Sequence, residues 1–183
     1  MKSEIKRYLG VANVSDPRID EMIDKAVVMI KDTATVKHTS KIFDITTDEN
    51  GVFCENLYFK SRNLRDLLKD CNQAVLLGIT LGVAVDRLIE RTAIENIALA
   101  SVLQSTAAAF IEEEIDKIEP EITYGKPHTM RFSAGYGDFD ITHQADILNI
   151  LQTYKIGLSV TDSMQLVPTK SVTAIIGIKK EQK

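Results

Sequence analysis

Hydrophobic positions in the first part of the chain recur at helical spacing. Residues 3–9 fit a short helix that Gly10 ends. A second helix is predicted to begin at Asp16 and Pro17, because aspartate accepts backbone N–H bonds at a helix start and proline there loses none. Apolar residues then follow every three or four positions, so this helix should extend to about Thr33 and bury one face.

The pattern changes to that of strands after this helix. Apolar residues at 36–59 are interspersed with threonine and charged residues, and the sequence at 48–51 is typical of a turn, which predicts two or three antiparallel strands. Ser61 can cap a following helix. The apolar run at 74–80 predicts a central strand that is buried on both faces, and its Gly78 indicates a close approach of another backbone segment.

Helices dominate the pattern further along the chain. A turn at Thr80-Leu81-Gly82 leads into a helix near 83–90, and its glycine either only makes the turn or admits an anion to the helix N-terminus. Residues 94–118 have a wide apolar surface, which predicts a long and largely enclosed helix that ends at or before Pro120. The elements expected after it are a loop-rich stretch, one helix and three strands, at 124–140, 142–151, 156–161, 164–167 and 171–178.

This order of elements indicates the fold class. Strands and long helices are segregated along the chain, which favours an α+β fold with a mixed or antiparallel twisted sheet packed with long helices. The length of 183 residues suits one domain. We therefore expect residues 1–183 to form a single domain, with a helical N-terminal part at 1–35 and an α+β core at 36–183.

Composition and charge exclude several classes of protein. The net charge is −4 and the pI is near 5.4, so the basic surface of a nucleic-acid-binding protein is not expected. The cysteines, Cys54 and Cys71, are far apart and suggest a reduced, cytoplasmic protein rather than a disulfide scaffold. Cys71 follows the helical spacing of its neighbours and is expected in the core. The first residues have no apolar signal region, and the apolar runs are shorter than a membrane span.

Familiar catalytic and metal-binding patterns are absent from the sequence. The histidines, His38, His128 and His143, do not have metal-ligand spacing. There is no glycine-rich dinucleotide or phosphate loop and no serine nucleophile elbow. We therefore predict neither a catalytic residue nor a bound metal ion.

One dense motif, Arg131-Phe132-Ser133-Ala134-Gly135-Tyr136-Gly137-Asp138, does carry binding chemistry. Its arginine offers a fork for a carboxylate or phosphate, its glycines can expose the backbone, and its tyrosine offers an aromatic face. These groups suit a small zwitterion that carries a purine. The alternative is a tight turn in which Arg131 pairs with a neighbouring acid and Tyr136 packs in the core.

The motif resembles the Arg-x-x-x-Gly-Tyr motif of the activation domain of cobalamin-dependent methionine synthase. The resemblance extends to Thr80-Leu81-Gly82, to Ala107–Glu112, and to the segment from Val160-Thr161-Asp162-Ser163-Met164 through Pro168 to Lys170-Ser171-Val172. It covers most of residues 60–178, and its matches occur in the same order. The chain looks closest to short proteins that bacteria encode apart from the catalytic modules.

This resemblance implies a function in cobalamin chemistry. In that family the domain docks on the cobalamin module and presents S-adenosylmethionine, and cobalt is methylated while a flavodoxin-like donor supplies one electron. The corrinoid-binding signature Asp-x-His-x-x-Gly is absent here, so another chain is expected to hold cobalamin. The expected partners are therefore cobalamin-binding methionine synthase modules or another corrinoid protein. The chain would be at most an accessory part of a methyltransferase.

The resemblance also assigns residues to an S-adenosylmethionine site. By position, Arg131 would contact the carboxylate of the ligand. Ala134 and Gly135 would offer backbone groups, and Tyr136 would stack or hydrogen-bond. Ser133 occupies the position of a proline in the family.

Two departures from the family pattern leave a second function open. Ala108 stands where fused members have an acidic residue, although Glu112, one turn further along, can substitute for it. The chain also ends at Lys183, before a C-terminal ligand-contacting extension of longer members. The first hypothesis is a reactivation component that binds S-adenosylmethionine, and the second is a docking module for a corrinoid protein that has lost the ligand. A third, an unrelated small-molecule enzyme, lacks a nucleophile and base.

Overall fold

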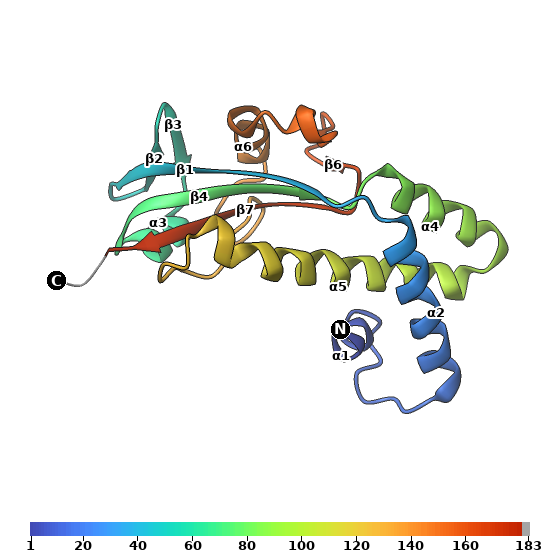
Figure 1. The fold of residues 1–183 in the computed structure, drawn as a ribbon. Helices are drawn as coiled ribbons and strands as arrows, with labels where there is room; N and C mark the ends of the chain where they lie inside the picture. The colour runs from blue at the N-terminus through green and yellow to red at the C-terminus, as the bar shows by residue number, and fades with distance from the viewer. Residues whose placement is uncertain (181–183) are drawn as a thin grey trace.

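A five-stranded sheet forms the centre of the computed structural model, which describes residues 1–180 (Figure 1). Its strand order is β3-β2-β1-β4-β7, and every neighbouring pair is antiparallel. A second sheet contains two short antiparallel strands, β5 and β6. The strands are β1 (Lys37–Thr47), β2 (Gly51–Cys54), β3 (Leu57–Lys60), β4 (Cys71–Thr80), β5 (Ser159–Val160), β6 (Leu166–Val167) and β7 (Ser171–Lys179).

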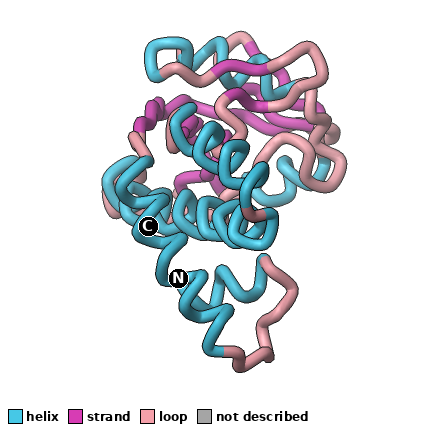
Figure 2. Tube along the Cα trace, turned by 90° about the vertical axis from the view of Figure 1, so that its right-hand side faces the viewer, coloured by secondary structure: helices cyan, strands magenta, loops and turns pink. Residues whose placement is uncertain are grey.

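Helices cover both faces of the sheet. The long helix α5 lies along one face, with α4 beside it and with α1 and α2 projecting from the same side, while α6 lies on the other face (Figures 1 and 2). The helices are α1 (Lys2–Tyr8), α2 (Pro17–Thr33), α3 (Arg62–Leu68), α4 (Val83–Glu95), α5 (Ile97–Ile122), α6 (His143–Leu151) and a 3₁₀ helix at Thr153–Ile156. Within the described residues, no helix has both the length and the hydropathy that a bilayer crossing requires.

The alternation of side chains along β4 divides the core into two clusters. Val75, Leu77 and Ile79 face the cluster that includes α2, α4 and α5, and Leu76 faces the cluster that includes α3 and α6. All four side chains are fully buried. The fold is therefore α+β with an antiparallel sheet and long helices, as the sequence predicted. The expectation of one domain over 1–183 stays a prediction, and residues 181–183 lie outside the described part.

Local signals in the sequence are confirmed at three positions. Asp16 accepts the backbone N–H of Arg18 at the start of α2, and Ser61 accepts that of Leu64 at the start of α3. Asp48 accepts two backbone N–H groups in the turn before β2. Gly78 does have a close neighbour, but this is the Thr153 side chain, 3.0 Å from the place of a Cβ atom, and not the backbone segment that the sequence predicted.

The predicted boundary between the two central helices was wrong. Asn96 has an extended backbone, with φ at −151°, and its side chain accepts the N–H of Leu99. It therefore caps α5 and separates it from α4, which extends to Glu95. The prediction of one helix from residue 94 treated this asparagine as an interior residue.

Other boundaries also differ from the prediction. Helix α5 continues past Pro120 to Ile122. A proline in the last turn removes one backbone hydrogen bond. The turn is still held, because both the N–H and the hydroxyl of Thr123 donate to the carbonyl oxygen of Glu119. Cys71 begins β4 instead of ending a helix, although it is buried as expected. The strand expected at 156–161 is reduced to β5, and the strand expected at 164–167 to β6.

Neither cysteine is a candidate nucleophile. Burial raises the pKa of the Cys54 thiol to about 11 and shifts the pKa of Cys71 in the same direction. Both thiols are therefore protonated at neutral pH, as expected of core residues.

Candidate functional site

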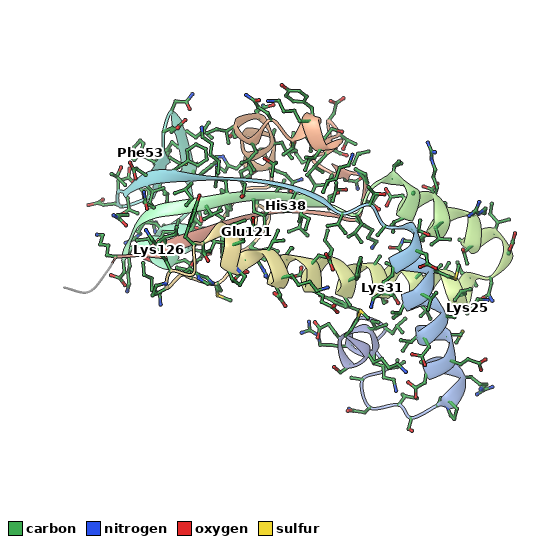
Figure 3. The ribbon with its side chains drawn as sticks, viewed as in Figure 1. Lys25, Lys31, His38, Phe53, Glu121 and Lys126 are labelled. Atoms are coloured by element: carbon green, nitrogen blue, oxygen red, sulfur yellow. The ribbon has the colours of Figure 1, made fainter. Side chains whose placement is uncertain are left out.

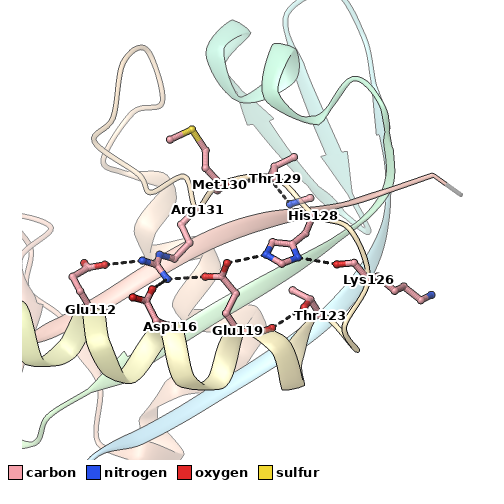
Figure 4. Close-up of polar contacts among 10 residues, drawn as sticks. Glu112, Asp116, Glu119, Thr123, Lys126, His128, Thr129, Met130 and Arg131 are labelled. Carbon is pink, nitrogen blue, oxygen red and sulfur yellow. Dashed lines mark hydrogen bonds and ion pairs between the residues drawn. The ribbon is translucent and has the colours of Figure 1, made fainter. Parts of the chain in front are cut away.

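The chain from Thr129 to Phe132, which includes the start of the dense motif, runs along the outer edge of β7. Phe132 and Ile175 exchange backbone hydrogen bonds of 2.9 and 2.8 Å, and Thr129 donates its N–H to the carbonyl of Gly177 at 2.9 Å. These bonds fix the loop to an edge strand that would otherwise be unpaired on this side. They also place the side chain of Arg131 over α5 (Figure 4).

Arg131 is held by three carboxylates from successive turns of α5. One terminal nitrogen lies 2.7 Å from Asp116 and 2.6 Å from Glu119, and the other lies 3.0 Å from Glu112 (Figure 4). Burial alone would lower the pKa of this guanidinium, but the hydrogen bond that it donates to Asp116 and the three negative charges outweigh it and raise the pKa above its ordinary value. Arg131 is therefore a fixed positive charge inside an acidic cluster.

His128 holds the most buried of these carboxylates in place. Its Nε2 lies 2.9 Å from Glu119, whose side chain is 18% exposed, and its Nδ1 lies 2.8 Å from the carbonyl oxygen of Lys126 (Figure 4). Glu119 therefore contacts Arg131 with one oxygen and His128 with the other. The loop and the end of α5 are linked through this glutamate.

The glycines of the motif form a compact turn that exposes its tyrosine. Gly135 has φ at +91° and donates its N–H to the carbonyl of Phe139, and Gly137 has φ at +54°. Only glycine adopts this backbone region without strain. Tyr136 is 58% exposed, and its ring meets Phe132 edge-on at 5.9 Å.

Asp138 anchors the end of this turn to α3. Its carboxylate accepts hydrogen bonds from the Ser61 hydroxyl at 2.5 Å, from the N–H of Arg62 at 2.8 Å and from the N–H of Asn63 at 3.1 Å. These donors, the Ser61 hydroxyl first, lower the pKa of Asp138. Two segments separated by more than seventy residues are thus joined next to the candidate site.

A cleft of about 410 Å³ lies between α5 and the motif. Among the predicted site residues, Glu112, Arg131, Ser133 and Tyr136 line this cleft. Ala134 is 6% exposed and belongs to the core cluster that includes α3 and α6, and neither it nor Gly135 lines the cleft. The volume lies within the range of small-molecule sites, which is about 300–1,000 Å³.

The two interpretations of the motif are each correct in part. Arg131 pairs with neighbouring acids, as the turn interpretation expected, but Tyr136 is exposed at the cleft and does not pack in the core. The sequence interpretation missed Asp116, Glu119 and His128 as members of the site. The spacing of the acids, at i, i+4 and i+7 from Glu112, was the available signal for one shared helix face.

Two other clefts adjoin these elements. One, of about 460 Å³, lies on the α1 side of Arg131 and shares Glu112 and Asp116 with the first. It includes Tyr8, whose pKa is raised by burial and by the charges of Glu112 and Glu4. The other, of about 820 Å³, is lined by residues around β3, the start of α3 and α6, including Arg62 and His143.

No cluster of histidine, cysteine or acidic side chains within residues 1–180 has the arrangement of a metal site. The acids around Arg131 are occupied by ion pairs with it. The groups that the cleft offers are therefore these paired charged side chains and the exposed ring of Tyr136.

Comparison with solved structures finds the same fold in a reactivation domain. A crystal structure of the MetH reactivation domain bound to AdoHcy superimposes with a TM-score of 0.67, over 98% of this chain and 75% of that chain. The sequences are 14% identical over this alignment, so the likeness establishes the fold. No protein-family model matches the chain. No curated protein matches it either.

Proposed function

We propose that this protein binds S-adenosylmethionine in the cleft between α5 and residues 130–136, and serves in the reactivation of a cobalamin-dependent methionine synthase. The observation that carries the proposal is the shared fold with the MetH reactivation domain bound to AdoHcy, over nearly the whole chain. In support, Arg131, Ser133 and Tyr136 of this motif line one side of a cleft of suitable volume.

The residues of the cleft fit the parts of this ligand. Tyr136 offers an exposed ring on which an adenine can stack. Arg131 can bind the ligand carboxylate in exchange for Asp116, whose side chain is 67% exposed and is the most accessible of its three partners. The carboxylates that remain can accept the ligand ammonium group. Glu112 thereby takes the role of the acid that is missing at Ala108.

The partner in this proposal holds cobalamin, and a flavodoxin-like protein supplies the electron. S-adenosylmethionine supplies the methyl group, and this chain contributes binding and orientation of the ligand. Met130, Tyr136 and Ile141 are exposed apolar side chains, at 73%, 58% and 41%, on the loop beside the cleft. They are suitable for contact with a docked cobalamin module, because apolar exposure around a cleft is typical of interaction surfaces.

One observation favours the alternative of a docking module that has lost the ligand. All three acids that face Arg131 already bind it, so a ligand carboxylate has to displace one of them. The two functions share the corrinoid partner and differ in whether S-adenosylmethionine binds.

Calorimetric titration with S-adenosylmethionine distinguishes these functions. We expect micromolar affinity, which corresponds to about 8 kcal/mol. Tyr136→Ala should weaken binding by about tenfold, since stacking of a base on an aromatic side chain is worth about 1–3 kcal/mol. Tyr154→Ala is the matched control, because Tyr154 is 71% exposed on the 3₁₀ helix and does not line the cleft.

The outcomes separate the hypotheses. Wild-type protein that releases no heat and gains no thermal stability with the ligand would contradict the proposal and favour the docking module. Binding that is equal in the Tyr136→Ala and Tyr154→Ala variants would place the ligand elsewhere on the protein.

A further inference from the structure

The first strand of the central sheet has an edge that is open along most of its length. β1 has 11 residues, but β2 pairs only with residues 45–47, and residues 37–44 pair on one side only, with β4. At the opposite edge of the sheet, the loop at 129–132 bonds to β7. Within the described chain, the fold therefore covers the β7 edge and leaves the longer part of the β1 edge unpaired.

The backbone groups at the open edge follow from the direction of the hydrogen bonds across the sheet, which alternates along an antiparallel strand. Ile175 bonds outward from β7, so residues 174 and 176 bond to residues 77 and 75 of β4. Residues 76 and 78 of β4 then bond to residues 41 and 39 of β1. The N–H and C=O groups of His38, Ser40 and Ile42 are left to point outward, and no backbone group within residues 1–180 bonds to them from the open side.

A groove of about 480 Å³ adjoins this edge, between β1 and the end of α5. Its lining includes His38, Ser40 and Ile42 from the strand, and Glu121, Ile122 and Tyr124 from the end of the helix (Figure 3). Ile122 is largely buried and Tyr124 is 74% exposed, so the groove offers both an apolar surface and an aromatic ring. Side chains of a strand added to β1 would point alternately into this groove and away from it.

The other face of β1 carries positive charge at the same edge. Lys37 and Lys41 alternate with the groove-facing residues and are both exposed. Lys41, which also borders the groove, extends over the ring of Phe43 at 4.6 Å, and Phe43 belongs to the core cluster on the α6 side. Its ion pair with Glu55 is long, at 3.8 Å, and about half exposed. Opposite charges that face each other across two strands are stabilising and like charges are destabilising, so these lysines favour an acidic neighbour.

We propose that the open edge of β1 binds an extended segment of a partner protein as an additional antiparallel strand. The segment would have carboxylates at two positions four residues apart, opposite Lys37 and Lys41. Its apolar side chains would alternate with the carboxylates and enter the groove beside Ile122 and Tyr124. The groove shares no lining residue with the cleft beside Arg131, so this interaction is independent of ligand binding there.

A second copy of this chain does not have the required chemistry. Its own β1 has lysines where the carboxylates are needed, at Lys37 and Lys41. Pairing of two β1 strands would gather the four lysines along one edge, which like-charge repulsion disfavours.

A synthetic peptide tests the chemistry of the partner. The probe is a fluorescently labelled peptide of sequence Thr-Val-Glu-Val-Thr-Val-Glu-Val-Thr, and the control has lysine in place of both glutamates. Fluorescence anisotropy of each peptide is measured with increasing concentrations of the wild-type protein. We expect the glutamate peptide to bind at least about tenfold more tightly, because two cross-strand charge pairs change from attractive to repulsive in the control.

Methylation of the peptide backbone tests whether binding is strand addition. In the antiparallel pair the valines lie opposite His38, Ser40 and Ile42, so their N–H groups face β1. A glutamate peptide that is N-methylated at its valines should lose binding, whereas one that is N-methylated at its glutamates should retain it. These measurements use the wild-type protein, so they do not depend on the folding of a variant.

Substitution of Ser40 provides the same test on the protein. Ser40→Pro removes an N–H that points outward, which an edge strand tolerates, and should abolish binding of the glutamate peptide. Ser40→Thr is the matched control, because threonine keeps the N–H and suits a strand, and it should bind as the wild type does. Thermal unfolding of both variants shows whether each is folded.

The contrary outcomes are equally definite. If the glutamate peptide does not bind, or binds no better than the lysine peptide, the proposal is overturned, and the lysines serve only to deter pairing at this edge. Equal binding of the two N-methylated peptides, or undiminished binding to folded Ser40→Pro, would overturn strand addition. These results leave the proposed binding of S-adenosylmethionine untouched, since that ligand occupies a different cleft.

Discussion

Removal of the Arg131 side chain should destabilise the protein as well as disturb the cleft. The guanidinium contacts three carboxylates at 2.6–3.0 Å, and without it these carboxylates repel one another on one face of α5. Arg131→Ala therefore tests whether the arginine is a structural element of the loop and helix, in addition to any contact with a ligand.

The exposure of each partner sets the expected magnitude. Asp116 and Glu112 are 67% and 38% exposed, and such pairs contribute about 0.2–1 kcal/mol each. Glu119 is 18% exposed and also contacts His128, so its bond to Arg131 is worth about 1.5 kcal/mol. After the cost of ordering the arginine, we expect a loss of about 2 kcal/mol in the free energy of unfolding, or about 4–8 °C in Tm.

Urea unfolding of Arg131→Ala and of a control arginine variant measures this loss. Arg18→Ala is the control, because Arg18 is 87% exposed and pairs with a single carboxylate, that of Asp16. Its free energy of unfolding should change by less than about 0.5 kcal/mol. High salt should recover part of the loss in Arg131→Ala, since a Debye length of about 3 Å at 1 M screens the remaining carboxylates.

Two results would contradict a stabilising role of the Arg131 ion pairs. One is an Arg131→Ala protein with the same free energy of unfolding as Arg18→Ala. The other is a loss that salt increases, because screening can only weaken the repulsion among the three carboxylates. Either result would mean that the ion pairs do not hold the loop to α5.

Two further predictions concern the packing of β4 and the pH dependence of stability. Gly78→Val should lower the free energy of unfolding by about 1–3 kcal/mol in urea titrations, because the valine side chain would overlap with those of Thr153 and Leu158. An unchanged free energy of unfolding would mean that these side chains can move to admit the valine. The pKa of Asp138 is lowered in the folded protein, so its contribution to stability is present above the unfolded pKa of about 4 and is lost as the pH falls through the folded pKa. Asp138→Asn should therefore be less stable than the wild type at neutral pH and should lose less stability on acidification, and equal slopes against pH would contradict the prediction.

Local chemistry explains why much of the fold could be predicted from the sequence. Asp16 and Ser61 cap their helices through their own side chains. The apolar run of β4 is typical of a strand buried on both faces, and its side chains do face two core clusters. Asn96 shows the limit of this reasoning. The sequence alone does not distinguish an asparagine that caps a helix from a polar residue inside one. The extended backbone of Asn96 distinguishes them, and tertiary packing determines that conformation.

The site was predictable only in its parts. The helical spacing of Glu112, Asp116 and Glu119 was visible, but the same spacing describes a solvated charged face. The position of Arg131 depends on backbone bonds between its loop and β7, which lies about forty residues further along the chain. The loop has no periodic pattern, so the sequence could not indicate that its arginine would meet these acids.

An NMR titration of the labelled protein with S-adenosylmethionine shows directly whether the ligand binds beside Arg131. We expect chemical-shift changes concentrated at backbone amides of residues 130–137 and 112–119, the two segments that contribute most of the residues lining the cleft. Amides that stay unchanged throughout the titration would contradict this expectation. Changes confined to residues 58–62 and 140–143, around the other large cleft, would contradict it equally, because they would assign binding to a different site.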